Sequence, residues 1–324
     1  MLVNQLNLPE PFVRATEAAL YSKGDARYSV TELIEPARIG ALRRFYVNDI
    51  VEDVADNVAS LMGTMFHKLL EAAGAPTTHA ILEERLYADI EGVTISGAMD
   101  HTILWDNGCL DDYKATKVYS VQTALRYGKP DWTAQLNIYR WLRSLLGQTI
   151  EKLRIIAWMK DWFIARAIAA AQGERPDSYP QHEILAIDIP VWPLEQTEAY
   201  IRGRIIAHKA ADEWAAATNG GVLLEVEGVD EPRCTDEDRW RNKTRWACMK
   251  ESRKTALKLY DTEAEARYAA SQEKGGYVEQ RGGEYRRCAL YCNVGRAGLC
   301  SQWEADKAVM KDNGHVIDTS AFDE

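Results

Sequence analysis

Apolar residues recur along the chain with two different spacings. Over residues 45–73 they are three or four positions apart, which predicts a helix that ends at Gly74. Residues 80–116 instead form three strand-like pieces. These pieces are separated by Glu91-Gly92 and by Asp106-Asn107-Gly108, which are favourable turn sequences. This stretch therefore predicts a three-stranded antiparallel meander.

The pattern after the meander alternates between helix and strand. Helical spacing over residues 131–147 is followed by a buried strand, a helix, a strand and a long helix over about 193–217. This order predicts an α/β fold with a mixed central sheet flanked by helices. The composition changes near residue 226, so we expect a core over residues 1–225 and a basic, cysteine-rich appendage over residues 226–324.

Composition and charge narrow the class of protein. The 39 basic and 49 acidic residues give a net charge of −10, which excludes a uniformly basic DNA-coating protein but not a local basic groove. No apolar run approaches the roughly 20 residues of a membrane span. The first residues, MLVNQLNLPEPF, do not resemble a signal peptide. We therefore expect a cytoplasmic protein that does not associate with a membrane.

The meander carries the main chemical signal. Asp112 and Lys114 are two positions apart on a predicted strand, so their side chains leave the same face. A three-residue loop over 106–108, with Gly108 in the left-handed conformation, would put Asp100 opposite Lys114 on that face. Paired carboxylates hold Mg²⁺ or Mn²⁺, and a lysine stabilises developing negative charge. This combination is suited to phosphodiester hydrolysis, although such a triplet alone is more often a solvated strand face.

Two helical pairs flank the meander. His67 and Glu71 are four positions apart on one face of the upstream helix, and a histidine ligand favours Mn²⁺. Gln135 and Tyr139 have the same spacing downstream and can offer an amide and a phenol to a nucleotide. Each pair alone is more typical of helix packing or of a solvated surface. It is their order around the meander that points to a site.

The segments GTMFHKLLE, ISGAMDHTI, LDDYKAT and AQLNIYRWL, within residues 63–142, resemble the motifs of the RecB-like branch of the PD-(D/E)XK nucleases. The chain is most similar to the stand-alone phage and prophage exonucleases of that branch. The resemblance implies a restriction-endonuclease-like core. It also implies metal-dependent DNA hydrolysis, commonly from DNA ends, in phage-type recombination or DNA processing.

The resemblance also implies a role for each matching residue. His67, Asp100, Asp112 and the backbone carbonyl of Tyr113 would hold Mg²⁺ or Mn²⁺, and Lys114 would be the catalytic lysine. Glu71 would support the site, while Gln135 and Tyr139 would contact DNA or position the lysine. A recombinase or single-strand annealing partner is expected for phage relatives. Two alternatives stay open, namely a DNA-binding module of this fold that does not cut, and an endonuclease.

Three cysteines crowd together near the C-terminus. Cys288, Cys292 and Cys300 suggest a metal site, which needs a fourth ligand. Cys234, in a predicted loop, is the first candidate and Cys248 the second. Four thiolates suit Zn²⁺ or an iron–sulfur cluster. Relatives that use one distant and three C-terminal cysteines bind a [4Fe–4S] cluster, although no cysteine here precedes the nuclease motifs. The alternative is ordinary buried cysteines.

A basic segment with two tryptophans precedes these cysteines. Over residues 239–258, basic side chains alternate with Trp240 and Trp246. Basic groups neutralise phosphates and aromatic rings stack on unpaired bases, so the segment is a candidate DNA contact. A solvated helical face with two core tryptophans is an equally good interpretation. The candidate DNA-binding residues are Arg239, Arg241, Lys243 and Arg245.

Overall fold

The computed structural model describes residues 1–18, 23–74, 80–173, 178–223 and 226–312. It contains two compact units. The first comprises Met1–Glu35 and Val51–Lys209, and the second comprises Pro36–Ile50 and Ala210–Glu324. This division differs from the boundary expected after residue 225, and it adds an N-terminal segment to the second unit.

Long-range packing explains the difference in boundary. The last turns of the long helix α8 (Leu194–Ala217) carry Ala211 and Trp214 into a core that also contains Ile39 and Leu42. A helix that is continuous in sequence can thus contribute to two cores. A change in composition along the chain does not report such packing.

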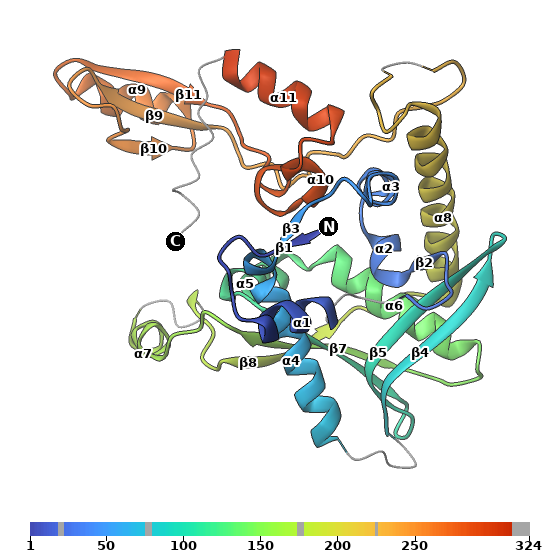
Figure 1. Ribbon diagram of the computed structural model, residues 1–324. Helices are drawn as coiled ribbons and strands as arrows, with labels where there is room; N and C mark the ends of the chain where they lie inside the picture. The colour runs from blue at the N-terminus through green and yellow to red at the C-terminus, as the bar shows by residue number, and fades with distance from the viewer. Residues whose placement is uncertain (19–22, 75–79, 174–177, 224–225, 313–324) are drawn as a thin grey trace. The chain divides into compact units, whose positions relative to one another are not determined.

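A mixed sheet forms the centre of the first unit (Figure 1). The strand order is β2-β5-β6-β7-β8, and β4 also pairs with β5. The pairs β4–β5 and β5–β6 are antiparallel, which confirms the predicted meander. The pair β7–β8 is also antiparallel, whereas β2–β5 and β6–β7 are parallel. The strands are β2 (Tyr28–Ser29), β4 (Ala80–Ile90), β5 (Val93–Ile103), β6 (Cys109–Thr116), β7 (Lys152–Met159) and β8 (Ile184–Ile189).

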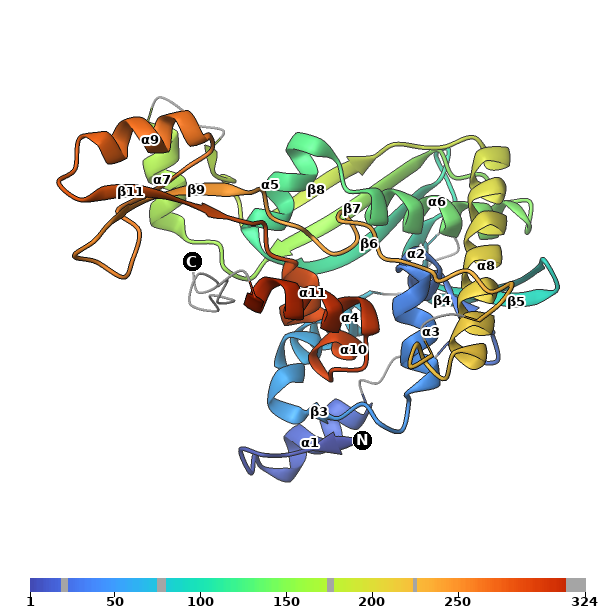
Figure 2. The same cartoon turned by 90° about the horizontal axis from the view of Figure 1, so that it is seen from above.

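Helices cover both faces of this sheet (Figure 2). The Phe66 ring of α4 lies 6.2 Å from the Tyr113 ring, whereas Gln135 of α6 hydrogen-bonds Asp112. Neighbouring residues of a strand point to opposite faces, so α4 and α6 lie on opposite sides of β6. The first unit thus has the mixed α/β architecture expected from the sequence. Its helices, besides α8, are α1 (Glu10–Ala18), α2 (Val30–Ile34), α4 (Val58–Ala73), α5 (Val118–Tyr127), α6 (Pro130–Ser144) and α7 (Ile164–Gln172).

The helix predicted over residues 45–73 is shorter in the structure. It begins at Val58, and the preceding residues form strand β3 (Glu52–Asp53), which pairs with β1 (Leu2–Val3), and a 3₁₀ turn. The Asp53 side chain accepts a hydrogen bond from the backbone N–H of Ala55, so Asp53 caps that turn. Among the described helices, none is both long and apolar enough to cross a bilayer.

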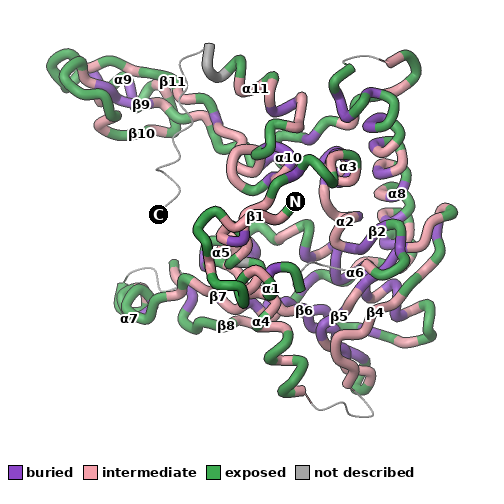
Figure 3. The backbone as a smooth tube through the Cα atoms, viewed as in Figure 1, coloured by how far each residue is buried: buried purple, intermediate pink, exposed green. Residues whose placement is uncertain are grey.

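The second unit contains a helical part and a small sheet. The helical part comprises α3 (Ala37–Phe45), α10 (Asn293–Arg296), α11 (Ser301–Asp312) and a π-helical turn, η3 (Arg287–Tyr291). The sheet has the order β10-β9-β11, and Figure 3 shows buried positions along β9 beside helix α9. The elements of this sheet are β9 (Arg245–Lys250), β10 (Lys258–Tyr260), α9 (Glu263–Ser271) and β11 (Gly276–Arg281).

Candidate metal centre and active site

The strands β5 and β6 pair at one end only. Residues 101–103 pair with residues 109–111, and at the other end of β5 its residues Ile95 and Ser96 pair with β2 instead. The two strands therefore separate beyond the His101–Asp111 pair, and Asp100 and Asp112 are the next residues on the two strands. This fork brings two carboxylates to a place where the ladder no longer joins their strands.

The loop between these strands is longer than predicted. It covers residues 104–108, so the register puts Asp100 level with Asp112 rather than with Lys114. The pairing ends at His101–Asp111, so the ladder does not fix the face of Asp100, whose side chain contacts His67 of α4 and the backbone N–H of Tyr113. Gly108 is left-handed as predicted, with a φ of 73°. Asp106 and Asn107 are also left-handed, which accommodates the two additional residues.

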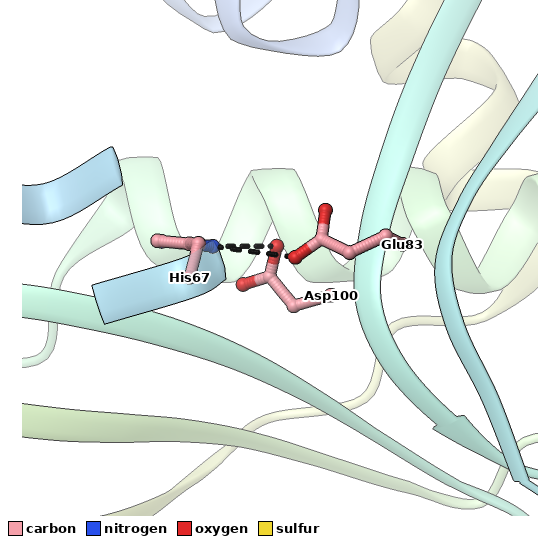
Figure 4. A group of neighbouring side chains, drawn as sticks. All are labelled: His67, Glu83 and Asp100. Carbon is pink, nitrogen blue, oxygen red and sulfur yellow. Dashed lines mark ion pairs between the residues drawn. The ribbon is translucent and has the colours of Figure 1, made fainter. Parts of the chain in front are cut away.

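Three side chains converge at the fork (Figure 4). The Nδ1 atom of His67 lies 3.2 Å from Oδ1 of Asp100 and 3.6 Å from Oε1 of Glu83. One ligand atom from each residue lies within 4.8 Å of the others. Ligands on one Mg²⁺ at about 2.1 Å are at most about 4.2 Å apart, so a small closure suffices. The donor set of one imidazole and two carboxylates fits Mg²⁺ or Mn²⁺.

Glu83 is the member of this group that the sequence analysis missed. It lies on β4 between Leu82 and Glu84, which pair with His101 and Met99, so Glu83 faces Asp100 across the ladder. A signal was present, because the two-residue turn Glu91-Gly92 fixes this register. Glu83 also has a left-handed backbone with a φ of 47°. Such strain at a non-glycine residue concentrates at functional sites.

Asp112 and Lys114 lie beside this group and are held from β6 and α6. Lys114 Nζ is 2.7 Å from Asp112 Oδ2, and the Gln135 amide donates to Asp112 Oδ1 at 3.2 Å. The same amide donates to the Tyr139 hydroxyl at 2.9 Å. Both Gln135 and Tyr139 are buried. They orient Asp112 and, through it, Lys114, rather than presenting polar groups at the surface.

The charges at the fork favour an added cation. Burial lowers the pKa of His67, but its hydrogen bonds to Asp100 and Glu83 outweigh burial and raise the pKa to about 10. Burial raises the pKa of Asp112, although the Lys114 ammonium opposes this effect. The Asp100 carboxylate contributes to both shifts, since its charge raises the pKa of His67 and that of Asp112. A divalent cation can replace the proton on His67 and neutralise the same carboxylates.

Two other predicted site residues behave differently from the expectation. Glu71 is exposed on α4, and it is not in the group whose ligand atoms converge among the described residues. The carboxylate beside His67 is instead that of Glu83. Tyr113 contributes its backbone N–H, which donates to Asp100 Oδ2 at 2.6 Å. The role expected for its carbonyl oxygen stays a prediction.

The structure brings the C-terminal cysteines together within the second unit. One pocket is lined by Cys234, Cys288, Cys292 and Cys300, whereas Cys248 is not among its lining residues and is buried in β9. Cys234 is thus the cysteine that joins the other three. Burial raises the pKa of Cys234 to about 12 and also raises the pKa of Cys288 and of Cys292. A bound metal would reverse these shifts, because thiolates are the ligands.

The spacing of these sulfurs bears on what they hold. Among the described residues, no three cysteine sulfurs lie within 4.8 Å of one another. Four thiolates on Zn²⁺ at about 2.3 Å would be about 3.8 Å apart. A [4Fe–4S] cluster spreads its four thiolates over separate iron atoms, which requires wider spacing. Which metal or cluster these four cysteines would hold stays a prediction from the sequence.

Of the four candidate DNA-binding residues in the basic segment, one lies at this pocket and three lie at the surface. Arg239 is only 5% exposed, forms an ion pair with Asp306 and lies 3.4 Å from the Tyr285 ring centroid. It also hydrogen-bonds Cys288, so it is a buried pocket residue and not the surface DNA contact we expected. Arg241, Lys243 and Arg245 are exposed. The segment is not helical, since it runs from a turn into β9.

Comparisons with known proteins give little further information. No family model matches the chain, and no curated protein matches it. A solved structure, the crystal structure of SSO0001, aligns with 60% of this chain and 83% of its own chain. The alignment has 18% sequence identity and a TM-score of 0.39. A likeness this distant carries no conclusion about function.

Proposed function

We propose that this protein is a divalent-metal-dependent deoxyribonuclease with a restriction-endonuclease-like core, of the RecB-like PD-(D/E)XK type. The observation that carries the proposal is the convergence of His67, Glu83 and Asp100 at the fork, with the Asp112–Lys114 ion pair beside them. The resemblance of the motifs within residues 63–142 supports the same conclusion independently of the geometry.

In this proposal His67, Glu83 and Asp100 hold Mg²⁺ or Mn²⁺, and Asp112 completes the carboxylate set. The bound ion supplies Lewis-acid polarisation of the phosphodiester and makes water more acidic. Lys114 stabilises the negative charge that develops on the phosphate, because its ammonium is held within the site by Asp112. Gln135 and Tyr139 keep Asp112 oriented through their buried hydrogen bonds.

The substrate is DNA, and we propose that cutting proceeds from its ends in phage-type recombination or DNA processing in the bacterial cytoplasm. End dependence, this setting and a recombinase or annealing partner rest on the motif resemblance. The convergence of three potential metal ligands disfavours the alternative of a module that binds DNA without cutting it. Endonuclease activity is an outcome that the experiment below separates.

The test is degradation of linear, circular and single-stranded DNA by the purified protein with Mg²⁺, Mn²⁺ or a chelator. We expect metal-dependent loss of linear DNA that Lys114→Ala abolishes. Asp106→Asn, which changes an exposed carboxylate in the β5–β6 loop, is the matched control and should keep activity. Equal cutting of circles would indicate an endonuclease. Binding of DNA without cutting under either metal would overturn the proposal.

We also propose that Cys234, Cys288, Cys292 and Cys300 hold a [4Fe–4S] cluster. Their shared pocket supports a thiolate-bound centre, and the resemblance to relatives with three C-terminal cysteines favours the cluster over Zn²⁺. The buried Arg239 guanidinium at Cys288 offsets part of the negative charge that four thiolates bring. Such a cluster would cross-link the second unit and would take no part in hydrolysis.

A further inference from the structure

Trp240 occupies a backbone position that favours glycine. It ends a helical turn, in which the N–H of Trp240 donates to the carbonyl of Glu237 and the N–H of Arg241 donates to that of Asp236, both at 3.0 Å. This pattern closes a helix end through a left-handed residue, which is usually glycine. Trp240 has a φ of 51°. A bulky aromatic residue is a rare choice for this conformation.

Burial does not explain the choice of tryptophan. Trp240 is 49% exposed, and the neighbouring Tyr291 is 58% exposed. Their ring centroids are 5.2 Å apart, with the ring planes tilted by 57°, so the two rings are in contact while about half of each side chain stays exposed. Large aromatic side chains normally stabilise a fold by being buried. A strained and exposed tryptophan is therefore better explained by binding than by folding.

The surroundings of this aromatic pair are polar and carry cationic groups. Trp240, Arg241, Asn242 and Lys243 line one open hollow of the second unit, together with Asp236 and Glu237. Arg241 forms an ion pair with Asp236 at 2.8 Å, which neutralises one of the two acidic groups. The Arg287 guanidinium lies 5.3 Å from the Trp240 ring centroid. The hollow thus combines one exposed indole ring with guanidinium, ammonium and amide donors and with two carboxylates, and Tyr291 packs beside that ring.

We propose that Trp240 and Tyr291 form a stacking platform for the bases of single-stranded DNA, with Arg241 and Lys243 on its phosphates. Exposed rings accept any base because every base has a π-face, and nearby cations follow the backbone. The proposal deepens the proposed function, on which it rests, by naming the strand form that this nuclease holds. A peptide partner would instead need an apolar pocket or a sheet edge.

The experiment measures binding of a labelled oligothymidine to the full chain by fluorescence anisotropy, with chelator present so that no strand is cut. We expect Trp240→Gly to weaken binding about tenfold or more, which is the effect of losing a stacked base. The same change should leave the melting temperature unchanged or raise it, because glycine relieves the backbone strain. Trp240→Phe keeps a ring and should retain most of the affinity.

Tyr268→Ala is the control, since Tyr268 is 72% exposed on α9 and belongs to neither the hollow nor the aromatic pair. Two results would overturn the platform: tight binding by Trp240→Gly, or a lower melting temperature that accompanies its loss of binding. Absence of oligothymidine binding by the unmodified protein would also overturn it and would favour a protein partner. Degradation of linear duplex DNA by the unmodified protein and by Lys114→Ala is measured separately. A failure of the proposed nuclease activity can therefore be distinguished from a failure of the proposed stacking platform.

Discussion

Glu71 and Glu83 both follow His67 in the sequence and carry the same carboxylate, but of the two only Glu83 reaches the imidazole. We expect Glu83→Gln to weaken Mn²⁺ binding and DNA degradation at least tenfold, because the site loses a charged ligand. Glu71→Gln should have a much smaller effect. Calorimetric titration of Mn²⁺ and an exonuclease assay measure both. A larger loss in Glu71→Gln would favour the role that the motif resemblance assigns to it.

Asp111 is buried in β6, where its partners are Arg154 and His101. Arg154 donates to its two oxygens at 2.6 and 2.9 Å, and His101 Nδ1 lies 3.0 Å away. Burial disfavours the charged carboxylate, but these contacts outweigh burial and lower the pKa of Asp111 from 3.8 to about 2. The folded state therefore holds this proton less tightly than the unfolded state.

The sign of this shift determines the pH dependence. The stabilisation from Asp111 is complete above about pH 4 and is lost as the pH falls through about 2. We expect Asp111→Asn to lower the free energy of unfolding at pH 7 by about 2 kcal/mol and to flatten its fall between those two pH values. Urea unfolding at several acidic pH values checks this, with Asp106→Asn as the exposed control. An unchanged acid dependence in Asp111→Asn would contradict the assignment.

At the scale of the elements, the β5–β6 hairpin depends on Gly108. A Cβ atom at this position would lie 2.1 Å from the carbonyl oxygen of Thr149, whereas nothing lies within 4 Å of one at Gly128. Both glycines have a positive φ, of 73° and 74°, so alanine strains the backbone at both positions. We expect Gly108→Ala to destabilise the protein more than Gly128→Ala in urea unfolding. Equal losses would mean that the Thr149 backbone moves away freely.

The elements were predicted well where the pattern is local and less well elsewhere. The meander strands and α6 follow alternation and helical spacing, and the structure confirms them. The helix over residues 45–73 was predicted too long, since apolar spacing does not reveal the cap at Asp53. The sheet β10-β9-β11 was not predicted, because its strands are short and gain stability only from pairing with one another.

At the scale of the whole molecule, the cysteine pocket gathers residues that are far apart in sequence. We expect the protein purified without oxygen to contain iron and sulfide and to absorb visible light. Cys234→Ala should lose the iron, while Cys248→Ala, which changes a buried cysteine outside the pocket, should keep it. Metal analysis and the visible spectrum measure this directly. Zinc in place of iron, or iron retained by Cys234→Ala, would contradict the cluster with these four ligands.

The sequence by itself determined the strand and helix pattern of the core and put Asp112 and Lys114 on one strand face, because residues close in the chain fix these properties. It also marked His67 and Asp100 as candidate metal ligands. Only the tertiary structure decided that Glu83 joins them, that Cys234 rather than Cys248 completes the pocket, and that Arg239 is buried. The reason is physical: each of these outcomes depends on strand register or on packing between segments distant in sequence, which local pattern does not encode.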